Sequence, residues 1–154
     1  MLSTRAQAPV TLRAATPHDA AAIRDLLERC RLPTDDLATS HPEFVVACAG
    51  ARIIGTGALE RFGEVGLLRS VALEAQWRGA GVGRLIVEEL ERRASASGVR
   101  ELILLTLTAR AFFERLGYSE KDRAQVSPAV RESAEFRSLC PASALCMTRN
   151  LTPK

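Results

Sequence analysis

Residues 71–84 of this 154-residue chain, VALEAQWRGAGVGR, decide the fold. An apolar run typical of a strand enters the segment, and the helical pattern LIVEELER of residues 85–92 follows it. Between them stand Gly79, Gly81 and Gly83, at alternate positions. Glycine lets a ligand come close to the backbone, and the first amides of a helix lack intrahelical partners and carry partial positive charge. The segment therefore predicts a strand, turn and helix that together bind a diphosphate.

Two common phosphate-binding motifs do not fit this turn. Gly-x-Gly-x-x-Gly would need glycine at position 84 or 86, where Arg84 and Ile86 stand, and the P-loop ending Gly-Lys-Ser/Thr is absent. The residues fit Arg-x-x-Gly-x-Gly instead, with Arg78, Gly81 and Gly83. This pattern resembles the acetyl-coenzyme A motif of the Gcn5-related N-acetyltransferase (GNAT) superfamily. A glycine-rich turn without a ligand is the alternative.

Length and composition favour one ordinary globular domain. The chain is 47% hydrophobic and 25% charged, and its net charge of +3 is too small to indicate nucleic-acid binding. No apolar run is long enough to span a bilayer, and the N-terminus lacks the apolar centre of a secretion signal. We therefore predict a cytoplasmic protein without a nucleic-acid or membrane partner. The cysteines form no Cys-x-x-Cys pattern, so we interpret them as buried thiols and predict no metal site.

Hydrophobic periodicity gives an order of strands and helices along the chain. Strands are predicted at residues 10–13, 43–49, 52–60, 64–73, 101–107 and 143–150, with a strand or extended turn from 118. Helices are predicted from 16 to about 31, from about 34, from the glycine turn to Gly98, at 108–116 and at 126–130. The strand, helix and strand around the glycine turn imply a parallel pair with a right-handed crossover.

A second motif supports the resemblance. Residues 111–118, AFFERLGY, look like the helix-four signature of the GNAT superfamily, and the element order is also the same. The resemblance implies an α/β (α+β) fold with a mixed, mostly antiparallel central sheet, a splayed parallel strand pair and about four flanking helices. The resemblance covers about residues 11–151, and we predict a single domain over residues 1–154 with a core of about 10–151.

The resemblance also implies how acetyl-CoA binds as co-substrate. Amides of the glycine turn would hold the pyrophosphate, and the strand before it would bind the pantetheine arm between the splayed strands. The residues implied are Val71, Ala72, Leu73, Arg78, Gly79, Ala80, Gly81, Val82, Gly83, Arg84 and Phe112.

The acceptor side is implied by the strand that enters the turn. Side chains alternate across a strand, and the resemblance places Leu67 and Arg69 at the acceptor pocket, at positions where other members carry a glutamate or histidine base. Ser70, beside them, is a further candidate substrate-binding residue. Arg69 suits a carboxylate, which predicts a small anionic acceptor with a free amine. Pairing of Arg69 with an internal acid, such as Glu60 or Glu64, is the alternative.

Catalysis needs a base for the amine and an acid for the leaving thiolate. Glu60 and Glu64 are the candidate bases, with a role as solvated turn residues as the alternative. Many GNAT members carry a tyrosine acid where this chain has Phe113, which cannot donate a proton. Tyr118 is the nearby candidate acid, and core packing is its alternative.

A narrower resemblance is to the bacterial arsenic-resistance N-acetyltransferase subfamily. It rests on residues 63–70, GEVGLLRS, and on the tail from Ala134 to Met147, which is interpreted as a loop before the last strand. It implies an acceptor like arsinothricin or phosphinothricin, with Arg137 as a second anchor. Arsenic binding by Cys140 and Cys146 is a further hypothesis, but six residues across a proline define no chelate.

Two other functions remain open from the sequence. One is acetylation of a peptide or protein amine, and the other is a coenzyme A-binding regulatory module without turnover. A homodimer is also compatible with the sequence.

Overall fold

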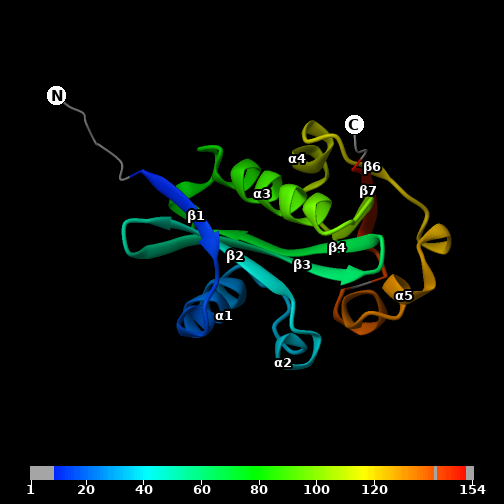
Figure 1. The fold of residues 1–154 in the computed structure, drawn as a ribbon, viewed down its shortest axis with the longest axis horizontal. Coiled ribbons are helices and arrows are strands. Elements are labelled where there is room, and N and C mark those ends of the chain that lie inside the picture. Colours follow the sequence, from blue (N-terminus) through cyan, green and yellow to red (C-terminus); the bar gives the residue numbers. More distant parts are fainter. Residues whose placement is uncertain (1–8, 141, 152–154) are drawn as a thin grey trace.

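The fold is built on one sheet. The computed structural model describes residues 9–140 and 142–151, with the backbone alone for Ser138 and Leu139. Seven strands follow the order β1-β2-β3-β4-β5-β7-β6 (Figure 1). They are β1 (Val10–Ala14), β2 (Glu43–Ala49), β3 (Arg52–Phe62), β4 (Val65–Leu73), β5 (Glu101–Thr106), β6 (Ser119–Glu120) and β7 (Leu145–Asn150). Only β4 and β5 pair in parallel within the described sheet, so the predicted fold class is confirmed.

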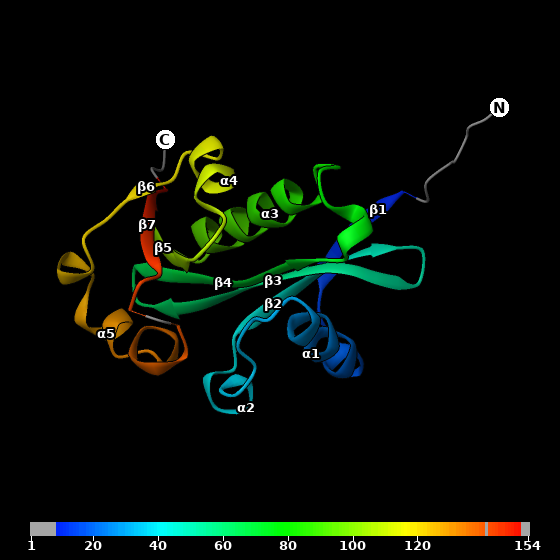
Figure 2. The same cartoon turned by 180° about the vertical axis from the view of Figure 1, so that it is seen from behind.

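Helices cover both faces of this sheet. The α-helices are α1 (Ala20–Arg29), α2 (Leu37–Ser40), α3 (Val82–Ala96), α4 (Arg110–Arg115) and α5 (Pro128–Arg131). Short 3-10 turns occupy Pro17–Asp19, Ala75–Trp77 and Arg123–Gln125, and Glu135–Leu139 forms a π-helix. Helices α3 and α4 lie on one side of the sheet, and α1, α2 and α5 lie on the other (Figures 1 and 2). No helix in the described ranges is long and apolar enough to cross a membrane.

Helix α3 packs directly on the backbone of β3. A Cβ built on Gly57 would lie 2.7 Å from Cγ2 of Ile86 and 2.8 Å from Cδ1 of Leu90. Since real Cβ atoms do not come that close, glycine is what allows the helix to lie this near to the strand. The core between α3 and the sheet includes Leu59, Leu68 and Val87.

Strand β4 changes its facing direction at Ser70. Thr56 of β3 opposes Ala72, whereas Ala58 opposes Arg69, so β4 carries one extra residue between these pairs. Ser70 takes the left-handed conformation, with φ of 59°. This is a β-bulge, which bends a strand and re-aims its side chains. Leu68 before the bulge and Val71 after it both pack under α3, although strict alternation would place them on opposite faces.

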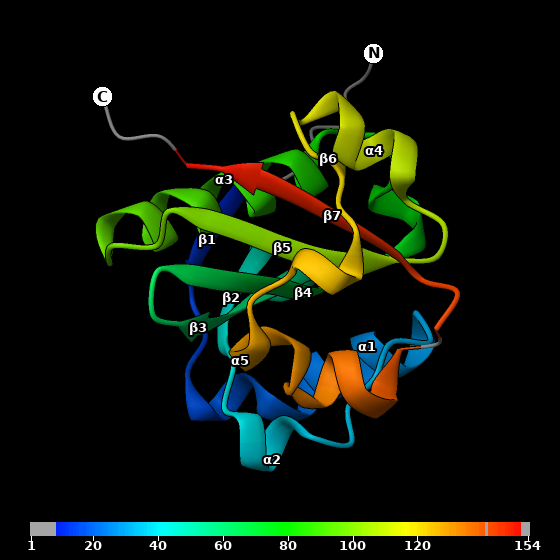
Figure 3. The same cartoon turned by 90° about the vertical axis from the view of Figure 1, so that its right-hand side faces the viewer.

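The C-terminal part of the chain closes the sheet. Strand β7 lies between β5 and β6, and α5 lies on the same side of the sheet as α1 and α2 (Figure 3). Leu67 of β4, Ile103 of β5 and Phe136 form an apolar cluster with residues of this segment. The predicted strands and helices are present with ends shifted by a few residues, but the π-helix replaces part of the predicted tail loop.

Candidate active site

The glycine turn exposes a run of free backbone amides. Gly79 and Gly81 have φ of 81° and 87°, a region that side chains with a Cβ rarely adopt. Gly81 caps α3, and a Cβ built on it would meet no atom within 4 Å. Among the residues that the structure describes, none accepts a hydrogen bond from the N–H groups of residues 79–84. Such a concave run of amides at a helix N-terminus is an anion site.

The turn stands at the open end of a fork between β4 and β5. The parallel ladder joins only residues 65–67 of β4 to residues 101–103 of β5. Beyond that point β4 stays paired with β3 as far as Leu73, and β5 stays paired with β7 as far as Thr106. The two strands therefore separate after Leu67, close to the bulge at Ser70.

The carbonyl of Leu73 faces away from β3. The N–H of Glu74 donates to the Ile54 carbonyl of β3 at 2.8 Å, so the trans peptide turns the Leu73 carbonyl to the opposite side. There it accepts long contacts from Cys30 Sγ at 3.6 Å and from Arg78 Nη2 at 3.5 Å. This carbonyl is thus available to a ligand that competes with two weak donors.

Phe112 lines the junction between the fork and the turn. A Cβ built on Gly83 would lie 3.2 Å from Cζ of Phe112 and 3.5 Å from Cδ1 of Leu73. Gly83, in the first turn of α3, therefore lies close to both the end of β4 and the ring of Phe112. Phe113 is buried and packs edge-on against both Phe112 and Tyr118.

Arg69 is buried among three carboxylates on the side of the sheet opposite α3. Asp36 accepts two hydrogen bonds from its Nη1 and Nη2, at 2.6 and 2.9 Å. Glu60 Oε1 accepts from Nη1 at 3.1 Å, and Glu135 Oε1 lies 3.3 Å from Nε, which donates to Ser70 Oγ at 3.1 Å. The Arg69 side chain has no exposed surface. We call Asp36, Glu60, Arg69 and Glu135 the Arg69 cluster.

The four charges of the Arg69 cluster perturb one another. Burial alone would raise the pKa of Asp36, but its hydrogen bonds from Arg69 and Ser40 outweigh burial and lower it. Burial raises the pKa of Glu60, against the hydrogen bond from Arg69. Burial likewise raises the pKa of Glu135 to about 7, with the charges of Glu60 and Asp36 adding to the rise. One guanidinium does not neutralise three carboxylates, so the cluster tends to hold a proton.

Arg69 thus pairs with internal acids, as its alternative interpretation predicted. Glu60 is one of these acids, whereas Glu64 is not, and Asp36 and Glu135 were not predicted. A carboxylate from an acceptor would have to displace one of them to reach the guanidinium.

Glu64 lies at the opposite end of the fork. It stands in the turn between β3 and β4, and its side chain is 74% exposed. Its carbonyl accepts from the N–H of Arg100, just before β5. The structure therefore does not bring Glu64 to the place where β4 and β5 separate.

Tyr118 also lies near the paired end of the fork. Its hydroxyl donates to Glu91 Oε2 of α3 at 2.7 Å, and Arg149 Nη1 lies 3.0 Å from the same oxygen. Arg149 is opposite Leu102 in the ladder of β5 and β7, and Leu102 is opposite Gly66 in the paired part of β4. Burial and the Glu91 charge raise the pKa of Tyr118. These contacts resemble those of a core tyrosine.

The remaining predicted acceptor residues differ in exposure. Leu67 is fully buried and packs against Ile103, Val126 and Phe136, so it presents no free surface. Arg137 is exposed on the π-helix, and no side chain in the described ranges pairs with it. Arg137 is therefore a free cation on the same side of the sheet as the Arg69 cluster.

The cysteines are free thiols with differing exposure. Cys48 and Cys146 are buried, and Cys30 and Cys140 are partly exposed. Burial raises the pKa of both Cys140 and Cys146 to about 11. Thiolate is the form that binds soft metalloids, and it is disfavoured at both positions.

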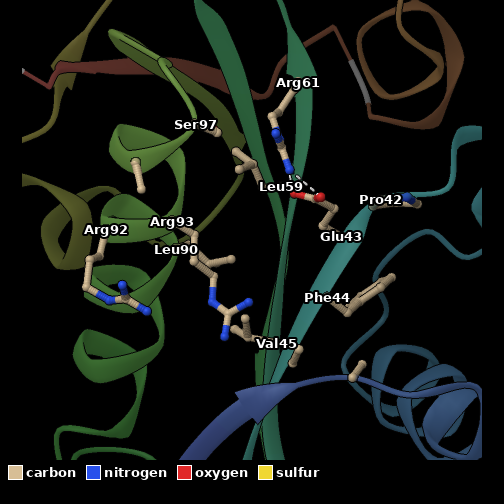
Figure 4. Close-up of a pocket in the computed structure, with 13 residues that line it drawn as sticks. Pro42, Glu43, Phe44, Val45, Leu59, Arg61, Leu90, Arg92, Arg93 and Ser97 are labelled. Atoms are coloured by element: carbon tan, nitrogen blue, oxygen red, sulfur yellow. Dashed lines mark hydrogen bonds and ion pairs between the residues drawn. The ribbon is translucent and has the colours of Figure 1, made fainter.

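A cavity of about 580 Å³ lies elsewhere, between α3 and strands β2 and β3 (Figure 4). Its floor includes Phe44, Leu59 and Leu90, and the ion pair of Arg61 and Glu43 borders it. None of the predicted site residues lines this cavity.

The sequence itself decides the family. Residues 40–120 match the family model described as an acetyltransferase (GNAT) domain. The chain belongs to the GNAT family. The glycine turn, the fork and α3 all fall inside the matched residues, and the predicted superfamily is thereby confirmed.

Two curated relatives, both named as N-acetyltransferases, each match more than half of the chain. The N-acetyltransferase CT2212 of Chlorobaculum tepidum is 37% identical over 82 residues, which are 53% of this chain and 52% of that protein. Glucosamine 6-phosphate N-acetyltransferase 1 of Oryza sativa subsp. japonica is 30% identical over 92 residues, 59% of this chain and 53% of that protein. Each match thus spans about half of the relative's length.

Solved structures share the fold over nearly the whole chain. Rv2747 from Mycobacterium tuberculosis, in complex with CoA and NLQ, has a TM-score of 0.79 at 26% identity, covering 92% of this chain and 99% of that one. N-acetylglutamate synthase from Neisseria gonorrhoeae, complexed with coenzyme A and N-acetyl-glutamate, has a TM-score of 0.83 at 18% identity, covering 96% of this chain and 36% of that one.

Asp36 and Glu135 are the residues that sequence reasoning missed. Asp36 follows the first helix, and Glu135 lies in the segment interpreted as a loop. A usable signal was the presence of Arg69 on a strand with apolar neighbours, because a buried arginine needs carboxylates around it. This signal predicts that carboxylates surround Arg69, but it does not identify which acidic residues they are.

Proposed function

We propose that the protein is an acetyl-CoA-dependent N-acetyltransferase that acts on the free amine of a small acceptor. The single observation that carries this proposal is the run of unpaired amides at residues 79–84, placed at the mouth of the fork between β4 and β5. A diphosphate held there would direct a bound chain into the fork. When bound, acetyl-CoA supplies a thioester as the acetyl donor.

The residues of this chain have distinct roles in the proposal. The amides of Gly79 to Arg84 bind the pyrophosphate, with the side chains of Arg78 and Arg84 nearby on the turn. The backbone of residues 71–73 binds the pantetheine arm in place of the missing β5 partner. Phe112 covers the arm from the side of α4. The fork holds the two reactants together, which makes their reaction effectively unimolecular.

Glu60 is the proposed base. It lies opposite Leu67 in the ladder of β3 and β4, beside the point where β4 leaves β5. It would take the proton of the acceptor ammonium, which leaves a neutral amine able to attack the thioester carbonyl. Since Phe113 has no proton to give and the Tyr118 hydroxyl lies near the paired end of the fork, the leaving thiolate takes its proton from water.

The proposed acceptor is a small anionic amino acid or an analogue such as arsinothricin or phosphinothricin. The support is the resemblance to the arsenic-resistance subfamily, together with the exposed guanidinium of Arg137. The structural relative complexed with N-acetyl-glutamate is consistent with an acceptor of this size. Arg137, rather than the neutralised Arg69, would bind its carboxylate. We also propose a role in arsenic resistance and a cytoplasmic location.

A coenzyme A-binding module without turnover is the second candidate function. The phenylalanine at position 113, in place of the usual tyrosine acid, favours it. Acetylation of a peptide or protein amine is the third.

Release of free thiol distinguishes these functions. The purified protein is mixed with acetyl-CoA and a thiol reagent, and a panel of acceptors is added: arsinothricin, phosphinothricin, the common amino acids, polyamines and peptides. We expect thiol release and an N-acetyl product with anionic amino acids. Release with peptides alone would favour a protein acceptor. Tight coenzyme A binding without release in any sample would favour the binding module.

A further inference from the structure

The Arg69 cluster joins three separate parts of the chain around one cation. Asp36 precedes α2, Glu60 lies on β3, and Glu135 begins the π-helix. Carboxylates within 3.3 Å of the same guanidinium carry three negative charges against one positive charge. An excess of buried charge is strongly unfavourable. The cluster relieves this excess by binding a proton, which is shared between coupled groups.

The guanidinium is shared unequally. Asp36 accepts a pair of short bonds from the fork of Arg69, an arrangement that holds a carboxylate strongly. Glu60 receives one longer bond, and Glu135 approaches the Nε group, whose hydrogen bond goes to Ser70. Asp36 is therefore the most fully neutralised acid. Glu60 and Glu135 compete for the remaining hydrogen-bonding capacity and charge of Arg69, so the proton that the cluster binds lies on one of these two carboxylates.

Glu60 is the member of this pair that can exchange a proton with a ligand. Its side chain is 10% exposed, compared with 6% for Asp36 and 4% for Glu135. In the described part of the chain, no donor reaches Glu60 Oε2. Cys140 is an ionisable neighbour of Glu135 and Arg69, and its thiol is protonated because burial raises its pKa to about 11; the charge of Arg123 also acts on Cys140.

We propose that Glu135 is a positioning residue for Glu60: by sharing Arg69, it weakens the hold of the guanidinium on Glu60, so that Glu60 can take a proton from the acceptor ammonium. The inference rests on the proposed function. In the step, an N–H bond of the ammonium breaks and an O–H bond forms on Glu60. The electron pair left on nitrogen is then free to attack the acetyl carbonyl.

The test follows the titration of Glu60 directly. Carboxyl carbons of ¹³C-labelled glutamate are recorded by NMR against pH, and the Glu60 signal is assigned by its loss in Glu60→Gln. In the wild type, Glu60 and Glu135 compete for the proton that the cluster binds near pH 7, so we expect part of the Glu60 signal to titrate near that pH. In Glu135→Gln this step should disappear, and Glu60 should titrate in a single step with a midpoint roughly one pH unit lower, a tenfold change in proton affinity. Glu132→Gln, an exposed position three residues earlier, is the matched control and should leave the midpoint unchanged.

The same variants are then compared in turnover. The acidic limb of kcat/KM against pH should move to lower pH in Glu135→Gln, in step with the NMR midpoint, whereas a merely structural loss would lower activity without moving the limb. Asp36→Asn is a second variant that should shift the titration midpoint of Glu60 in the same direction. It replaces Glu135→Gln in both measurements if that variant does not fold.

The outcomes separate this inference from the proposed function. An unchanged Glu60 midpoint in both variants, with acetyl transfer intact, would overturn the inference alone. Thiol release absent for every acceptor would instead overturn the proposed function, and with it the catalytic role of Glu60.

Discussion

Substitution of Gly81 by valine tests the amide run at the start of α3. The side chain would project into the open space above this residue, where nothing lies within 4 Å, and would occupy the position proposed for the pyrophosphate. Hydrogen bonds to a charged group contribute about 1.5 to 3 kcal/mol each. Blocking two of them would weaken coenzyme A binding by about 3 to 6 kcal/mol, a roughly 140- to 20,000-fold rise in Kd.

The same substitution also strains the backbone, so it needs a matched control. Gly63, in the turn between β3 and β4, has φ of 67° and likewise has no atom within 4 Å of its would-be Cβ. It lies at the opposite end of the fork from Gly81. A side chain in the left-handed region costs about 1 to 2 kcal/mol at either position, which lowers Tm by roughly 2 to 8 °C.

Calorimetric titration with coenzyme A and thermal melting are the two measurements. We expect Gly81→Val and Gly63→Val to lose similar amounts of stability, while only Gly81→Val loses coenzyme binding. If a folded Gly81→Val bound coenzyme A with the affinity of the wild type, the diphosphate would have to lie elsewhere, and the reasoning from the glycine turn would be refuted.

Three further predictions concern single side chains. Burial raises the pKa of Glu135 from 4.5 to about 7 in the folded state, so the free energy of unfolding is highest below about pH 4.5 and falls as the pH rises through 7. Because glutamine does not ionise, Glu135→Gln should abolish up to about 3 kcal/mol of this fall, measured by urea unfolding at pH 4.5 and 8. An identical pH dependence of stability in the two proteins would contradict the burial argument. Tyr118→Phe removes the hydrogen bond to Glu91, so we expect stability to fall by about 1 to 3 kcal/mol with kcat unchanged; a large loss of kcat in a stable variant would make Tyr118 the acid after all. Arg137→Gln should raise KM for anionic acceptors about tenfold without changing KM for acetyl-CoA, because the acceptor carboxylate loses one charge-assisted hydrogen bond. The control Arg131→Gln, also exposed on the α5 side of the sheet, should change neither KM. Equal KM values in the wild type and both variants would show that Arg137 is not part of the acceptor site.

The part of the fold around the glycine turn was predictable from local sequence. Glycines at 79 and 81 mark backbone that must enter the left-handed region, and the apolar patterns on either side have periods of two and 3.6. Because those signals lie within a few residues of one another, they give the strand, the turn and the helix without knowledge of distant contacts. The parallel pairing followed from the chain order alone.

The surroundings of Arg69 could not be predicted in the same way. The partners Asp36 and Glu135 come from segments that are far from Arg69 in sequence, and no local pattern states which acids fold against it. The left-handed conformation of Ser70 could not be predicted from the sequence either, since serine has no preference for that conformation. The prediction that Arg69 could serve an anion therefore depended on resemblance, and the structure shows how fully its charge is already used.

The bulge at Ser70 divides one strand into two independent halves. Leu67 and Arg69 before it face the C-terminal segment and Asp36, and Val71 and Leu73 after it pack with α3. On the proposed function, the first half would meet the amine and the second half the coenzyme. Substitutions upstream of Ser70 could then change which amine is accepted while the donor site stays as it is, so a single extra residue would let the two specificities evolve separately.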